Sequence, residues 1–395
     1  MNFVRVSSSS VLIAILYGWS CQLGAALCPA CTPVLVPTLG EQLADSDSAF
    51  LVKLVSTRKT NLKNGKSSRT TLSILQIEFD IEKKYKKGEK LVLAKVVTGK
   101  VGDLFFLSGT RKKETDPVAW SKLQAISRSA YNYVTQAPPI DAPNAERLPY
   151  YLNFLENPDS TIAFDAYAEF TKAPYQDVAA LRKILPRKKL RKWLTNTKTI
   201  PARIGLYGLM LGICGTKEDI GFMENQITVL RTNFNVGVDG VISGYLLLVG
   251  EKGLDLIDKE KLTNKKTSAA QAYSTMQALR IVWSYGKDRI PRNRLKKSMR
   301  LLLDRKDIAE FAIGDLSRWQ DWSVQNRLMQ MFRSKDFGTK GIRTAIVRYM
   351  IASTKDIPEG TEPTSLKYVQ SGKKFLAELK KLDPTTYRRA IRFGF

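Results

Sequence analysis

The fold of this chain is decided by two helix-length runs, Arg203-Ile-Gly-Leu-Tyr-Gly-Leu-Met210 and Val238-Asp-Gly-Val-Ile-Ser-Gly-Tyr-Leu-Leu-Leu248. In each run, small residues interrupt large apolar ones. A residue without a side chain lets a neighbouring backbone approach closely. The glycines of the two runs are therefore predicted to be helix-packing points: Gly205, Gly208, Gly240 and Gly244.

Comparable apolar runs recur along the chain and predict a stacked-repeat architecture. They begin near positions 163, 203, 238, 270, 309 and 342, at intervals of 40, 35, 32, 39 and 33 residues. This irregular pitch is at or just below the roughly 40-residue period of two-helix repeats of the HEAT type. One helix pair cannot bury its own apolar face, whereas stacked pairs can. The sequence therefore predicts an α-solenoid over residues 148–353.

Ahead of the helices the apolar period changes to two, which indicates β-strands. The best example is 72–81, where alternation predicts one apolar face, made of Leu75, Ile77, Phe79 and Ile81. Asn64-Gly65 is a hairpin signal between two such runs. Four or five strands within about 70 residues predict a small barrel of the OB type.

Two resemblances follow from these motifs. Cys28-Pro-Ala-Cys31, the lead-in Leu43-Ala-Asp-Ser-Asp-Ser-Ala-Phe50 and the strands after it resemble a netrin/TIMP-type barrel, although the additional disulfides common in that family cannot form here. The segment 149–352 resembles the HEAT-like repeats of exported bacterial proteins. The second resemblance implies an interaction scaffold, and neither supplies catalytic residues. The predicted fold class is α+β, an OB-like β-barrel followed by a HEAT-like α-solenoid of helical hairpins.

The first residues predict an export signal. Arg5 is the only charged residue before position 41, 11–17 is a short apolar core, and Gly24-Ala-Ala26 offers the small residues of a cleavage site. We therefore expect export to the periplasm or the outside of the cell, with association to the envelope as an open alternative. No later stretch approaches 18 uncharged apolar residues, so no transmembrane segment is predicted.

These signals divide the chain into five predicted parts. They are a signal peptide (1–26), an OB/netrin-like barrel (27–115), a connecting segment (116–147), helical repeats (148–353), and a basic C-terminal helix with its tail (354–395).

The residue composition excludes several kinds of chemistry. The chain has no histidine, so Ser-His-Asp and Cys-His nucleophile systems and His-ligated metal sites are ruled out. No catalytic constellation and no metal-ligand set is recognisable, and no cofactor is expected. In an exported chain, Cys28 and Cys31 are predicted to form a disulfide, although the same pair also resembles a redox motif. Cys214 is predicted to be a buried small hydrophobe.

The chain is strongly basic, with 63 Lys and Arg against 37 Asp and Glu. The candidate binding residues in the basic clusters are Arg187, Lys188, Lys189, Arg191, Lys192, Arg292, Lys296 and Arg300. A cationic surface attracts polyanions. Export argues against nucleic acid and favours a protein or an anionic envelope polymer as partner. The same spacing also suits a solvated basic exterior, and both interpretations stay open.

The segment 315–322 supplies the remaining candidates, Arg318, Trp319 and Trp322. If helix continues through it, both tryptophans lie on one face beside Arg318, as an interface hot spot requires. The alternative is a turn with tryptophan in the core and an Arg–Asp pair at the corner.

Together these features predict a non-enzymatic binding or scaffold protein of the envelope. One alternative is a thiol-redox or carboxylate enzyme with its site near the barrel–solenoid junction, and another is electrostatic attachment to membrane or polysaccharide. The sequence does not indicate an oligomeric state.

Overall fold

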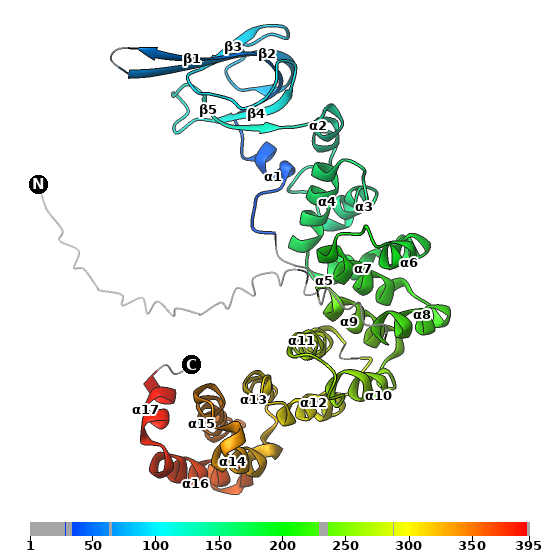
Figure 1. The fold of residues 1–395 in the computed structure, drawn as a ribbon, viewed down its shortest axis with the longest axis vertical. Coiled ribbons are helices and arrows are strands. Elements are labelled where there is room, and N and C mark those ends of the chain that lie inside the picture. The colour runs from blue at the N-terminus through cyan, green and yellow to red at the C-terminus, as the bar shows by residue number, and fades with distance from the viewer. Residues whose placement is uncertain (1–27, 29–33, 63–64, 229–235, 287, 393–395) are drawn as a thin grey trace, which may run out of the picture.

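The computed structural model describes residues 28, 34–62, 65–228, 236–286 and 288–392. It is α+β: a curled antiparallel sheet comes first, and helices then follow one another along an arc that ends at α17 (Figure 1). This confirms the predicted class. The predicted signal peptide and Cys31 lie outside the described residues.

The sheet has five antiparallel strands in the order β3-β2-β1-β4-β5. The strands are β1 (Ser48–Leu62), β2 (Gly65–Asp80), β3 (Lys90–Leu93), β4 (Leu104–Thr110) and β5 (Ala119–Ala125). β1 and β2 form a long hairpin that is paired from Ser48 opposite Asp80 to Leu62 opposite Gly65, as the Asn64-Gly65 signal predicts. β5 lies beyond residue 115, where the sequence places the end of the barrel.

Alternate residues of β1 serve two cores because both faces of the sheet are covered. Phe50, Val52 and Leu54 pack inside the curl. Ala49 and Leu51 belong to the large core shared with the helices. The sheet is therefore built onto the helical part of the molecule.

The predicted apolar face of β2 is wrong. Ile77 packs inside the curl, whereas Leu75 and Phe79 pack on the helix side and Ile81 is exposed. The reason is two register shifts against β1, which leave Leu75 and Glu78 as extra residues. Each extra residue of a β-bulge moves the following side chains to the other face.

Helices make up the rest of the described chain. Their bounds are α1 (Leu39–Ala44), α2 (Arg128–Thr135), α3 (Asn144–Leu152), α4 (Ser160–Lys172), α5 (Tyr175–Ala180), α6 (Arg187–Thr195), α7 (Pro201–Cys214), α8 (Lys217–Thr228), α9 (Val238–Val249), α10 (Gly253–Ile257), α11 (Ala269–Tyr285), α12 (Arg292–Leu301), α13 (Ala309–Arg318), α14 (Gln325–Arg333), α15 (Lys340–Lys355), α16 (Lys367–Leu382) and α17 (Pro384–Arg392).

Local sequence sets several of these helix ends. α1 and α11 begin at full capping boxes, with Thr38 and Ser268 as the N-cap residues. Pro201 occupies the first turn of α7, where its missing N–H costs nothing. Along the arc, α11, α13 and α15 lie on the inner side and α10, α12 and α16 on the outer side (Figure 1).

Two helices approach each other backbone to backbone at the glycine joint, which we define as the contact of α7 with α9. A Cβ on Gly240 would lie 2.1 Å from the carbonyl oxygen of Gly205, and one on Gly244 would lie 2.1 Å from that of Gly208. A Cβ on Gly208 would meet the Val241 backbone at 2.6 Å. The four predicted packing glycines are therefore confirmed, because backbone lies on backbone here with no room for a side chain.

A search for membrane-spanning helices found no suitable one among the described residues, since none combines the necessary length with enough apolar character.

Candidate functional site

The predicted basic cluster at 187–192 forms α6, and its two arginines are held by one buried carboxylate of α8. Arg187 donates from Nε to Asp219 Oδ2 at 2.5 Å, and Arg191 donates from Nη1 to Asp219 Oδ1 at 2.8 Å. Arg187 also pairs with Glu218 at 2.6 Å, and Arg191 lies over the Phe222 ring at 4.4 Å. These arginines join α6 to α8.

Asp219 is fully buried but still carries its charge. Burial alone would raise its pKa, but hydrogen bonds from the Thr216 amide and from Arg187 and Arg191 outweigh burial and hold the pKa below its usual range. The Thr216 bond is 2.9 Å long and resembles one half of a capping box, with Asp in place of Glu. Sequence reasoning grouped all these cations as one surface because the partner carboxylate lies about 30 residues away.

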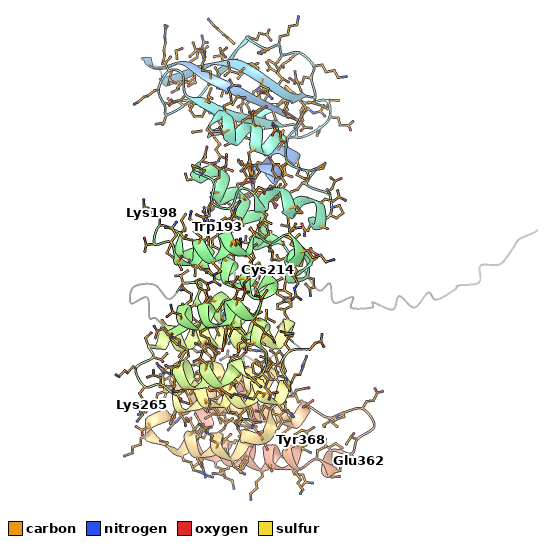
Figure 2. All side chains as sticks on the ribbon, turned by 90° about the vertical axis from the view of Figure 1, so that its right-hand side faces the viewer. Trp193, Lys198, Cys214, Lys265, Glu362 and Tyr368 are labelled. Carbon is orange, nitrogen blue, oxygen red and sulfur yellow. The ribbon has the colours of Figure 1, made fainter. Side chains whose placement is uncertain are left out.

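The lysines of α6 differ from its arginines. Lys188, Lys189 and Lys192 are exposed, and among the described residues none of them forms an ion pair. The neighbouring exposed cations extend this set: Arg182, Lys183 and Lys198. Figure 2 looks onto the outer side of the arc and shows Lys198 at the edge of the helical layers, with Trp193 nearby. We call Lys188, Lys189 and Lys192 the lysine row.

The predicted cluster on α12 is held by partners. Arg300 makes two hydrogen bonds to Asp321, at 2.6 and 2.8 Å, and Lys296 donates to the Gln320 carbonyl at 3.2 Å. Arg292 lies over the Trp283 ring at 4.4 Å. The α12 cations therefore act mainly within the fold, and α6 and α12 do not present equivalent surfaces.

The helix does not continue through Trp319 and Trp322, so the condition under which they would share one face is not met. α13 ends at Arg318, and Gln320 adopts a left-handed backbone conformation with φ of 52°, which turns the chain. Trp319 is buried and stacks on Trp283, with ring centroids 4.2 Å apart. Trp322 points elsewhere and donates from Nε1 to Asp356 at 2.5 Å.

An Arg–Asp pair does hold this corner, and it joins α12 to the turn after α13. Asp321 pairs with Arg300 of α12, whereas Arg318 pairs with Asp315 on its own helix. Because Trp319 is buried and Trp322 is hydrogen-bonded, the structural alternative describes this corner better than an exposed hot spot does.

The cysteines divide between described and undescribed residues. Cys28 is buried, and its amide donates to the Thr171 carbonyl at 3.1 Å. Its pairing with Cys31 stays a prediction, because Cys31 lies outside the described residues. Cys214, labelled in Figure 2, is partly buried; burial raises the pKa of its thiol to about 11. A thiol with that pKa is protonated near neutral pH and is a poor nucleophile.

A cavity of about 350 Å³ lies where the sheet meets the helices. Its lining comes from the segment before and within α1, from β5 and from α4: Val36, Pro37, Leu39, Gln42, Gln124, Thr161, Phe164 and Asp165. Junctions between structural units are common places for ligand pockets. We call this the junction cavity.

α4 carries two buried carboxylates, of which Asp165 lines the junction cavity. Asp165 accepts from the Leu39 amide at 2.6 Å and from the Tyr133 hydroxyl at 2.9 Å. Glu169, one turn later, pairs with Arg147 at 2.5 Å. Burial raises the pKa of Asp165 to about 6, despite these two hydrogen bonds, and burial also raises the pKa of Glu169.

Sequence reasoning missed both carboxylates, although a signal was present. The run Ile162-Ala-Phe-Asp-Ala-Tyr-Ala-Glu-Phe170 places two acids four residues apart within an otherwise apolar helix. That spacing puts both on one helix face, and charged groups on an apolar face are paired or functional.

Among the residues that the structure describes, no group of three or more acidic or sulfur-bearing side chains is arranged to hold a metal ion. No protein-family model, curated protein or solved structure matches this chain.

Proposed function

We propose that this chain is an exported, non-enzymatic binding or scaffold protein of the cell envelope. In this proposal its curled sheet is an OB-like barrel, its helices are a HEAT-like α-solenoid, and the lysine row binds an acidic protein or an anionic envelope polymer. Stacked-repeat architectures present extended surfaces of this kind.

The observation that carries the proposal is the separation of roles on α6. Arg187 and Arg191 fix the helix to Asp219, so the helix is a rigid support. Lys188, Lys189 and Lys192 are left exposed on that support. Cations that hold no internal partner can pair with an external anion without breaking a contact of the fold.

The test compares two triple variants with equal charge change. The first is Lys188→Glu, Lys189→Glu and Lys192→Glu. The control, on α16, is Lys373→Glu, Lys374→Glu and Lys380→Glu, at positions that are likewise exposed. Each variant is used in a salt-resolved pull-down from an envelope extract and in a titration with a linear polyuronate.

We expect the native chain and the α16 variant to bind, with an affinity that falls as salt rises, and the α6 variant to lose binding. If binding by both variants were weakened equally, diffuse electrostatic attachment would be favoured instead. Unchanged binding by the α6 variant would remove the lysine row from the proposal.

A further inference from the structure

The junction cavity combines an apolar wall with a small number of polar groups. Val36, Pro37 and Leu39 line one part of it, and Phe164, whose side chain is 48% exposed, lines another. Gln42, Gln124 and Thr161 supply polar side chains. A volume of about 350 Å³ lies at the lower end of the range of small-molecule pockets. The cavity therefore suits a small ligand with an apolar body and one polar end.

The charge of that polar end follows from Asp165. Its side chain lines the cavity, and the residue is only 5% exposed. Its two hydrogen-bond donors among the described residues, the Leu39 amide and the Tyr133 hydroxyl, are both neutral. An ionised carboxylate has about four acceptor positions, so the two bonds leave acceptor capacity unused. A buried carboxylate with only neutral donors lacks a countercharge.

The nearby cations are committed to other carboxylates. Arg147 pairs with Glu169, and Lys172 pairs with Glu41 while also donating to the Val36 carbonyl at 3.3 Å. Asp165, Glu169 and Glu41 make three carboxylates against two cations. Among the residues that the structure describes, this group is short of one positive charge, and Asp165 is its carboxylate that lines the cavity.

We propose that the junction cavity binds a small organic ammonium ion, whose charged nitrogen donates to Asp165 and whose apolar body lies against the Val36–Pro37 and Phe164 walls. A carboxylate together with an aromatic ring is a combination that favours organic cations. This site is separate from the lysine row, which attracts anions.

The same geometry couples binding to pH. Because the pKa of Asp165 is raised to about 6 by burial, a fraction of the carboxyl is protonated in mild acid. A protonated carboxyl lacks the charge that attracts an ammonium. Over the window from pH 5 to pH 7.5, affinity for an amine should rise about tenfold as the carboxyl ionises.

Calorimetric titration of the full chain with benzylamine and with benzyl alcohol tests the proposal. The two probes have nearly the same shape, and only the amine is cationic at neutral pH. We expect saturable benzylamine binding and at least about tenfold weaker binding of the alcohol. Asp165→Asn should reduce the affinity for benzylamine to that for benzyl alcohol. Phe164→Ala should reduce the affinity for both probes, and because Phe164 is half-exposed this change does not endanger folding.

The lysine-row variant serves as the control, because it should bind benzylamine like the native chain even if the proposed function is wrong. The proposal is overturned by equal affinity for amine and alcohol, by unchanged binding in Asp165→Asn, or by no saturable binding of benzylamine at millimolar concentration. Tighter binding of a lysine-containing peptide than of free amines would overturn the small-molecule assignment.

Discussion

Two parts of the helical arc are joined in different ways. At the glycine joint, α7 and α9 meet backbone to backbone through Gly208, Gly240 and Gly244. Further along the arc, charged side chains connect neighbouring helices. The pairs are Arg294–Asp258 at 2.8 Å, Arg300–Asp321 at 2.6 Å, Arg327–Asp304 at 2.6 Å and Arg343–Asp383 at 3.5 Å.

The difference shows that one architecture can be held together by shape or by charge. The glycine joint tolerates no added atom, since displacement of backbone is the only response. An ion pair near the surface can be lost while the side chains re-hydrate. Mutation at the glycine joint should therefore cost much stability. Mutation of an ion pair should cost more stability the more deeply the pair is buried.

The largest effect is expected for Gly244→Ala. The added Cβ would lie 2.1 Å from the Gly208 carbonyl oxygen and 3.2 Å from the Leu209 Cα, so the helices must separate. We expect a loss of about 3 kcal/mol or more in the free energy of unfolding, measured by denaturant titration. The control is Gly221→Ala on α8, which has open space around it and should gain up to about 1 kcal/mol from helix propensity. Similar small effects for both variants would refute the tight joint.

Next in size is the removal of the buried charge in Asp219→Asn. Arg187 and Arg191 lose their shared partner, and because both are about one-third exposed we expect a cost of roughly 2 to 3 kcal/mol. Glu218→Gln is the matched control, since Glu218 is 79% exposed and should cost less than about 0.5 kcal/mol. Thermal unfolding at pH 7 compares the two, and equal shifts in the melting temperature would contradict the anchoring role of Asp219.

The pH dependence of stability should separate Asp219 from Asp165. The lowered pKa of Asp219 means that its stabilisation is present at neutral pH and is lost as pH falls through the acid range below about 4. The pKa of Asp165 is raised to about 6, so its protonated form stabilises the fold below about pH 4. Its contribution falls by roughly 3 kcal/mol as pH rises to 6 and above.

Unfolding titrations from pH 4 to pH 8 test the Asp165 part of this prediction with Asp165→Asn, which should flatten the slope between pH 4 and pH 6. The groups around Asp165 that also titrate or carry charge are Glu169, Glu41, Arg147, Lys172, Tyr133 and Tyr151. Glu169 also has a raised pKa and contributes a slope of the same sign, so some pH dependence should persist. An unaltered slope in the variant would assign the effect to Glu169 alone.

The smallest effect is expected for the exposed pair of Arg327 and Asp304, whose side chains are 36% and 78% exposed. Asp304→Asn should change the free energy of unfolding by less than about 1 kcal/mol, and added salt should reduce the difference further. If Asp304→Asn destabilised the protein as much as Asp219→Asn, burial would not determine how much an ion pair contributes to stability.

What sequence could predict followed from local periodicity. The packing glycines and the β1–β2 hairpin are encoded within a few residues, so their patterns were readable. The partners of Arg187 and Arg300 could not be predicted. Asp219 reaches Arg187, and Asp321 reaches Arg300, only when segments distant in sequence stack. The face of β2 was mispredicted because a bulge leaves no mark on simple alternation.

The lining of the junction cavity could not be predicted for the same reason, because its walls come from three segments distant in sequence. The one local sign was the pair Asp165 and Glu169, two acids within an apolar helix.

The contact of the N-terminal segment with α4 sets an order of events during synthesis. Leu39 binds Asp165 across 126 residues, and Lys172 reaches back to Glu41 across 131. At roughly 5–20 residues per second, a ribosome needs on the order of 6 to 25 seconds between making the two sides of this contact. The early segment must wait for α4 to emerge, and until then no wall exists on one side of the cavity. The hairpin of β1 and β2, whose partners are adjacent in sequence, has no such delay.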